Sequence, residues 1–328
     1  LKLQALELNS IAFQCGERNK HVLQRDVMEL AYPFKFIGEE AFTSAILSIS
    51  EGKQTGVFFT IGHGEREIDE FDRYGFSSVV ESIKRDNFKV IALDLLGKKE
   101  IPDNCEVLVI AGPTKPFSTE EINIIRGYLG NNGKLLVMLE PALDPNLPTG
   151  LKPMLQDYGV KLRDDVLIYN KEKNPMFGFQ LVSKVHVSKD EYQEHKITKE
   201  MSNLSTVFFG ACGIETVKAH GDQGLVNRNF VVKPLAYAPD QAWGEVTIIA
   251  NVKPVYSPDE DLSGPISLAV AVEQVDPNAI GSGGSHEGSS LDKDAIEGTR
   301  IVVFTDVDFA ANEFIRNPGN QDLLRNSV

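Results

Sequence analysis

The sequence predicts an α/β protein with a doubly wound, mainly parallel sheet that carries a β-rich insertion. The first observation is a series of short apolar runs at residues 56–61, 107–111 and 134–139, each long enough for a strand and short for a helix. Such runs suit parallel strands that are buried on both faces. The second observation is that helical stretches alternate with these runs, which favours right-handed crossovers and parallel pairing.

The segment that precedes these strands predicts a hairpin. Residues 10–14 and 21–25 are strand-like and flank Gly16 and Asn19. Glycine and asparagine tolerate the positive φ that tight turns require. We therefore expect an edge hairpin at the N-terminus.

Helices are expected before and between the strands. Apolar side chains recur at steps of three and four in residues 38–50 and again in residues 76–87, as in amphipathic helices. A strand at residues 89–93 follows. Ser118 and Glu121 have the spacing of a capping box, which predicts that the next helix begins there.

The second half of the chain reads as β-rich, with few helical stretches between its strands. A strand at residues 299–305 is expected to return to the first sheet, followed by a helix through about residue 315. The Gly- and Ser-rich residues 280–295 have the composition of a flexible loop. The expected strands of the insertion are residues 166–169, 180–187, 206–209, 215–219, 230–236 and 265–275.

These patterns predict a discontinuous domain organisation. The N-terminal edge hairpin occupies residues 1–37, and the α/β domain comprises residues 38–164 and 296–328. The β-rich insertion occupies residues 165–295 and contains the flexible loop.

Composition excludes several classes of function. The chain has 47 acidic and 33 basic residues, a net charge of −14, which argues against a nucleic-acid partner because phosphate binding needs clustered Lys and Arg. Cys15, Cys105 and Cys212 are too widely spaced to support disulfides or a zinc site. No apolar run approaches the roughly 20 residues of a membrane helix, and no signal peptide is recognisable. Because the sequence begins at Leu1, we expect it to be a fragment of a longer protein.

The end of strand 56–61 is the first candidate site. Gly62 and Gly64 flank His63 and are followed by Glu65. Ligands of open α/β sheets bind beyond the carboxyl ends of the strands, where His63 could bind a ligand or act as a base. The alternative is a turn histidine that hydrogen-bonds to backbone. Glu65 could orient the imidazole, or it could simply favour a helix start.

Other polar or glycine-containing strand ends are expected at the same edge. Carboxylates that meet there could bind a metal ion or sugar hydroxyls, although aspartate after a strand is also a common helix cap. We predict a ligand-binding rather than a catalytic or metal site. Its residues are Gly62, His63, Gly64, Glu65, Gly112, Pro113, Glu140, Asp306 and Asp308.

Motifs for common enzymatic chemistry are missing from the sequence. It contains no G-x-S-x-G or G-x-C-x-G nucleophile elbow, no Walker A motif and no G-x-G-x-x-G. The remaining histidines lack metal-ligand spacing. We therefore expect a non-enzymatic protein without a cofactor. The alternative is a hydrolase of glycans or peptides in which His63 is the base with Glu65 or Asp306.

A series of short motifs, in order, resembles the GldG-type auxiliary proteins of ABC transporters, which are named for a gliding-motility component. Each motif is weak alone, but together they cover most of the chain. The motifs are GEEAFTSA at 38–45, FFTIGHGE at 58–65, LVIAGP at 108–113, GKLLVMLEP at 133–141, HKIT at 195–198, AWGE at 242–245, LAVAVE at 268–273 and VVFTDVDFAAN at 302–312.

The resemblance implies an extracytoplasmic, periplasmic domain of a membrane-anchored protein, whose membrane helices are absent from this fragment. Its expected partners are the permease and ATPase subunits of an ABC transporter. It further implies a flavodoxin-like or class I glutamine-amidotransferase-like core, and similarity to an intraflagellar-transport domain for which sugar binding has been proposed. The amidotransferase nucleophile has no counterpart here, which favours a non-catalytic binding or scaffolding domain with a carbohydrate or other polar ligand.

Overall fold

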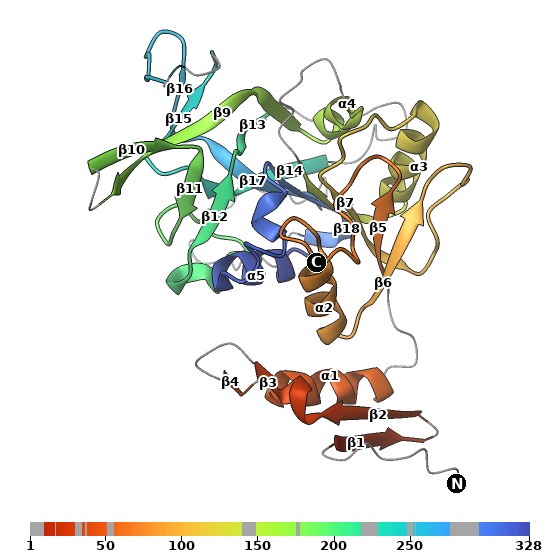
Figure 1. Ribbon diagram of the computed structural model, residues 1–328. Helices are drawn as coiled ribbons and strands as arrows, with labels where there is room; N and C mark the ends of the chain where they lie inside the picture. Colours follow the sequence, from red (N-terminus) through yellow and green to blue (C-terminus); the bar gives the residue numbers. More distant parts are fainter. Residues whose placement is uncertain are drawn as a thin grey trace, which may run out of the picture.

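The computed structural model describes most of the chain and shows a mixed α/β fold around one large sheet (Figure 1). Within the described residues this sheet has twelve strands. The described residues are 10–16, 18–29, 35–36, 38–50, 56–139, 149–174, 178–217, 229–247, 252, 254–275 and 295–328.

Five neighbouring strands form the parallel part of the sheet, and every pairing between them is parallel. The last strand of the chain thus returns to the first sheet, beside the strand at residues 134–138. In spatial order the five are β18 (Ala295–Phe304), β8 (Lys134–Met138), β7 (Cys105–Ala111), β5 (Gly56–Ile61) and β6 (Lys89–Asp94).

Both faces of this parallel part are covered by helices, as expected for a doubly wound fold. Along β5, Val57 and Phe59 point to one face and Phe58 to the other, and all three are buried. The first face packs against α2 (Ser77–Arg85) and α5 (Pro318–Arg325). The second face packs against α3 (Thr119–Gly130) and α4 (Leu151–Asp157). Burial on both faces explains why the strands are continuous apolar runs.

The β-rich segment extends the same sheet with antiparallel strands. β17 (Ser267–Val275) pairs antiparallel with β18 and lies between the two parts. A separate antiparallel pair is formed by β11 (Lys184–Val187) and β12 (Thr206–Phe209), with η2 (Met201–Asn203) between them. The other strands of the extension are β9 (Val160–Asn174), β10 (Gly178–Val182), β13 (Cys212–Thr216), β14 (Asn229–Tyr237), β15 (Trp243–Glu245) and β16 (Leu262–Ser263).

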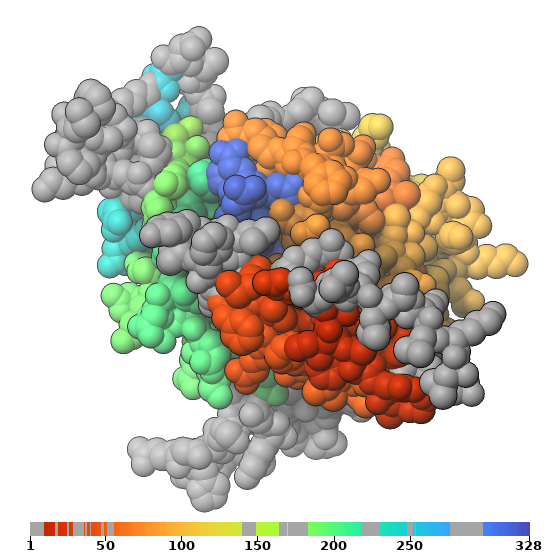
Figure 2. All heavy atoms as spheres, turned by 60° about the horizontal axis from the view of Figure 1, so that its bottom comes forward, coloured from red at the N-terminus to blue at the C-terminus, as the bar shows by residue number. Residues whose placement is uncertain are grey.

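The N-terminal hairpin is confirmed, but its turn is tighter than expected and it is not an edge of the large sheet. β1 (Ser10–Cys15) pairs with β2 (Arg18–Leu23) in a sheet of their own, which packs on α1 (Gly38–Ser50). Cys15 already pairs with Arg18, and Gly16 after Cys15 has φ +61°. Figure 2 shows these residues in red, on the face that lies at the bottom of Figure 1. The unit also contains η1 (Gln24–Val27), β3 (Met28–Glu29) and β4 (Lys35–Phe36).

The prediction of a helix after the last strand, through about residue 315, is wrong. Only a short η3 (Asp308–Ala310) forms there. The chain is then held in turns because the Asn312 amide donates to the carbonyls of Glu70 and Asp72, and its backbone N–H donates to Gly75. The helices α4 and α5 were not predicted from the sequence.

Among the described residues, no helix combines the length and the apolar character needed to cross a membrane. The flexible loop proposed at residues 280–295 lies outside the described residues apart from position 295.

Asn320 of α5 is buried and joins this helix to β12 and η3. Its Oδ1 accepts from Val207 N–H at 2.9 Å, and its Nδ2 donates to the Phe309 carbonyl at 2.8 Å. Asn320→Ala leaves buried backbone groups without partners, so we expect it to lower the free energy of unfolding by about 2–3 kcal/mol in denaturant titrations. Gln321→Ala, on the same helix, is the control. Equal unfolding midpoints for the two variants would contradict this role.

Candidate functional site

His63 lies directly after β5, in a loop that two glycines allow to turn. Gly62 has φ +110° and Gly64 has φ +74°. A Cβ at Gly64 would also lie 2.2 Å from Thr114 Oγ1. The imidazole stacks on the Phe117 ring, with 3.9 Å between ring centroids, and only 11% of its side chain is exposed. The histidine is therefore packed into the loop rather than presented to solvent.

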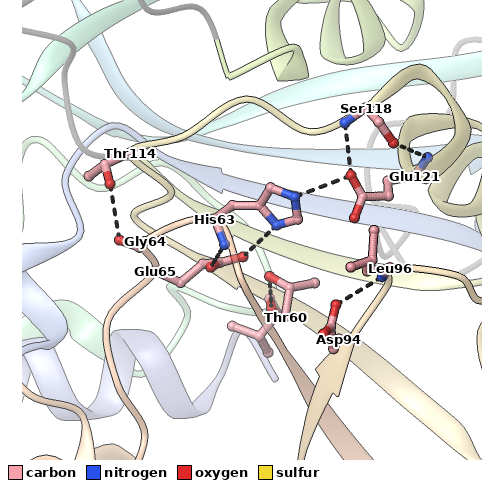
Figure 3. A network of polar contacts seen from close by, with 10 residues as sticks. Thr60, His63, Gly64, Glu65, Asp94, Leu96, Thr114, Ser118 and Glu121 are labelled. Atoms are coloured by element: carbon pink, nitrogen blue, oxygen red, sulfur yellow. Dashed lines mark hydrogen bonds and ion pairs between the residues drawn. The ribbon is translucent and has the colours of Figure 1, made fainter.

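Two carboxylates flank the imidazole (Figure 3). Glu121 Oε2 is 3.2 Å from His63 Nε2, and Glu65 Oε1 is 3.6 Å from His63 Nδ1. Both acids also accept from backbone: Glu65 from His63 N–H at 2.7 Å, and Glu121 from Ser118 N–H at 2.8 Å. The network therefore joins the end of β5 to the first turn of α3.

The capping box expected from Ser118 and Glu121 is confirmed. The contact between Glu121 and His63 was not predicted, because no local pattern indicates it. Burial disfavours the ionised form of Glu121. Hydrogen bonds from Ser118 and the neighbouring His63 outweigh that effect and hold the pKa of Glu121 below its usual value.

The remaining candidates at this edge serve mainly as backbone supports. The His63 carbonyl accepts from Thr114 and Lys115 N–H at 2.9 and 2.8 Å. Gly112 has φ +64° and donates to the Met138 carbonyl at 2.7 Å, and the adjacent Pro113 is buried. Glu140 lies outside the described residues.

Asp306 binds backbone N–H groups. It is buried, and its oxygens accept from the backbone N–H groups of Phe209 at 2.7 Å and Asp308 at 2.8 Å. Asp308 instead pairs with Arg66 at 2.6 Å, which ties η3 to the loop carrying Glu65. Burial raises the pKa of Asp308, despite the opposing charges of Arg66 and Arg73. The structure thus brings His63 and Glu65 together with Glu121, whereas Asp306 links the backbone of β12 to that of η3.

Most polar atoms of the His63 network are already hydrogen-bonded within the protein. His63 Nδ1 and Glu65 Oε1 are its two buried atoms without a hydrogen bond in the described part of the chain, and they face one another. Among the described residues, no group of three or more His, Cys, Asp or Glu side chains has the arrangement of a metal site.

A second buried histidine, His195, was not among the predicted site residues. His195 and its partner Glu273 both lie in motifs that carry the family resemblance, HKIT and LAVAVE. His195 Nε2 lies 3.3 Å from Glu273 Oε1, and Lys233 donates to the other oxygen at 2.7 Å. Because His195 Nδ1 accepts from Ile197 N–H, we infer that the proton is on Nε2 and is donated to Glu273. The His195 hydrogen bond is the largest cause that lowers the pKa of Glu273 to about 2; burial opposes it and Lys233 adds to it.

Comparison with known families places most of the chain in one group. A family model described as "ABC-type uncharacterized transport system" matches residues 54–327. The match covers the whole of the large sheet and leaves out the N-terminal hairpin and α1.

Comparison with individual proteins gives more distant likenesses. The chain is 26% identical to the intraflagellar transport protein 52 homologs of Mus musculus over 98 residues and of Homo sapiens over 96 residues. Each match covers 29% of this chain but only 22% of the relative's length. A solved structure, the mmIFT52 N-terminal domain, is similar with a TM-score of 0.52 and 14% identity, over 82% of this chain and 94% of that one. At this identity the likeness shows the fold alone.

His63→Ala tests whether the imidazole stabilises the loop. The substitution removes the stack on Phe117 and leaves Glu65 and Glu121 buried without their shared partner. We expect a loss of about 2–4 kcal/mol in the free energy of unfolding, measured by denaturant titration. His186→Ala, at an exposed position, is the control. A His63→Ala protein as stable as this control would show that the network contributes little.

The lowered pKa of Glu273 predicts that the free energy of unfolding depends on pH. Its folded pKa of about 2 lies below the ordinary 4.5, so its contribution is present above pH 4.5 and is lost as the pH falls toward 2. Glu273→Gln is expected to remove about 1–3 kcal/mol at neutral pH and to flatten the stability profile in that window. The measurement is chemical denaturation at a series of pH values.

The control for this pH profile is Glu215→Gln, which removes an exposed carboxylate paired with Lys161. If both variants keep the wild-type profile between pH 4.5 and 2, the Glu273 interaction is not the source of acid sensitivity.

Proposed function

The chain belongs to the family of ABC-type uncharacterized transport systems, and we propose that it is a non-catalytic binding or scaffolding component of such a system. It acts beside ATPase and permease subunits, on the extracytoplasmic side, and is anchored by membrane helices that this sequence does not include. The gliding-motility type of auxiliary protein is the subtype that its motifs resemble.

The observation that carries the non-catalytic part of the proposal is the closed network around His63. Both ring nitrogens face carboxylates, and the ring is covered by Phe117. A general base must reach the proton that it removes. A hydrolase would require this network to open, so the hydrolase alternative is less favoured.

A carbohydrate or other polar ligand at the carboxyl edge stays a prediction. The loop of Gly62, His63, Gly64 and Glu65 would meet such a ligand together with Gly112 and Pro113. Its binding there would have to displace the contacts between the imidazole and its two acids.

The loop that follows this network is suited to docking a partner. Phe71 is 80% exposed, although its loop is fixed by the Asn312 hydrogen bonds to the carbonyls of Glu70 and Asp72. An exposed aromatic side chain on an ordered loop loses little conformational entropy when it binds.

The charges around Phe71 indicate the chemistry of that partner. The pKa of Glu70 is raised, and the largest cause is repulsion from Asp72. Glu67 and Asp69 repel it as well. A basic surface with an apolar recess would relieve this repulsion and accept the Phe71 ring. We assign this surface to a protein subunit of the transporter.

The test is association of the full-length protein with its own transporter. The tagged protein is co-expressed with the ATPase and permease subunits, extracted in detergent and purified, and the co-purified subunits are quantified. We expect both subunits to co-purify, and Phe71→Ser to reduce their recovery at least severalfold.

Val255→Ser is the matched control, since Val255 is also 77% exposed but lies near β16, at the other end of the sheet. Recovery of the protein without either subunit would overturn the proposed role. Recovery that is equally strong in both variants would overturn the assignment of the Phe71 loop only.

A further inference from the structure

A hollow of about 820 Å³ lies at the opposite edge of the parallel strands from His63. It opens where β7 and β8 begin, and where Arg300 of β18 pairs with Lys134. The loop at residues 99–103 and one side of α3 form its walls. Among the residues that the structure describes, none of those predicted from the sequence to bind a ligand lines it.

Gly127 of α3 helps to open this hollow. The residue is exposed, and a Cβ built on it meets no atom within 4 Å. A glycine inside a helix is less favourable than alanine by about 1 kcal/mol. No neighbouring atom is close enough to require the absence of a side chain at position 127. A larger side chain at position 127 would instead project into the hollow.

Several polar side chains around the hollow have no partner among the described residues, whereas Tyr128, Lys134 and Glu106 bind one another or nearby backbone. Within the part of the chain that the structure describes, seven of the lining side chains make no hydrogen bond or ion pair. They offer amide, carboxylate and cationic groups together. The seven are Lys99, Glu100, Asp103, Asn123, Asn131, Asn132 and Arg300.

The charges of the lining cancel. Lys99, Lys134 and Arg300 are balanced by Glu100, Asp103 and Glu106, and Lys134 is already paired with Glu106. A lining without net charge gives no advantage to a polyanion or a polycation. It favours a ligand that is itself net neutral.

The mixture of amide, carboxylate and cationic side chains in the lining further restricts the chemical class of the ligand. Amides both donate and accept, carboxylates accept, and Lys and Arg only donate. A hydroxyl group can donate to one of these groups while accepting from the next. Ile101, Pro102 and Ile124 add apolar surface for the C–H groups of such a ligand.

We propose that the hollow between α3 and the amino ends of β7 and β8 binds a net-neutral, hydroxyl-rich small molecule, a polyol or saccharide. The binding site is separate from the His63 network and from the Phe71 loop. Binding in the hollow is independent of the proposed transport role and of any ligand at the carboxyl edge.

The test is a titration of the ¹⁵N-labelled 328-residue chain, followed by amide chemical shifts. The probes are myo-inositol, methyl α-D-glucoside and methyl β-N-acetylglucosaminide, with maltotetraose to distinguish a free sugar from part of a glycan chain. Glycine betaine and inorganic phosphate are the zwitterionic and anionic comparisons. We expect at least one hydroxyl-rich probe to shift the amides of residues 99–101, 103, 127 and 131–133.

Gly127→Leu should abolish these shifts by filling the hollow. Gly130→Leu is the matched control: it lies on the same helix, its Cβ likewise meets nothing within 4 Å, and it does not line the hollow. Loss of binding in Gly127→Leu alone supports the site.

Three results would overturn the proposal. The hydroxyl-rich probes could cause no shifts in the wild-type protein, betaine or phosphate could bind in preference to them, or their shifts could persist in Gly127→Leu. Should Gly127→Leu fail to fold, Asn131→Asp is the second variant, since it adds a charge to the lining without added bulk and should weaken binding at least severalfold.

Discussion

Burial of both faces of four parallel strands is the constraint on which the rest of the molecule depends. Side chains from β5, β7, β8 and β18 enter two separate apolar clusters, one with α2 and α5 and one with α3 and α4. Because the strands have no solvent-facing side, polar residues are confined to their ends. The two edges of the sheet are therefore where any binding chemistry must lie.

The two edges differ in how their polar groups are used. At the carboxyl edge, His63, Glu65 and Glu121 bind one another, and Asp306 binds backbone N–H groups, so these groups hold loops in place. At the amino edge, Asn123 and Arg300 line a hollow, and their side chains have no partner among the described residues. A polar group that is hydrogen-bonded within the protein must give up that bond to bind a ligand, whereas an exposed group without a protein partner exchanges only water for the ligand.

Sequence reasoning worked where an element depends on its immediate neighbours. The capping box of Ser118 and Glu121 and the helix at residues 38–50 are confirmed. It failed where a distant residue intervened: the helix expected after Asp308 is replaced by turns because Asn312 binds the loop around Glu70. The Asn317 and Pro318 start of α5 was readable as an N-cap and was overlooked.

The sequence by itself determined the parallel strands, three of the helices, the mixed α/β class and the position of His63 at a strand end, but it merged β10 and β11 into one strand and did not predict β15 or β16. The predicted features follow from side-chain periodicity and caps, which act over a few residues. Only the tertiary structure decided that Glu121 meets His63 across 58 positions, and that Asn320 meets Val207 across 113. Such contacts depend on strand order and on the directions of packed helices, which no local pattern encodes.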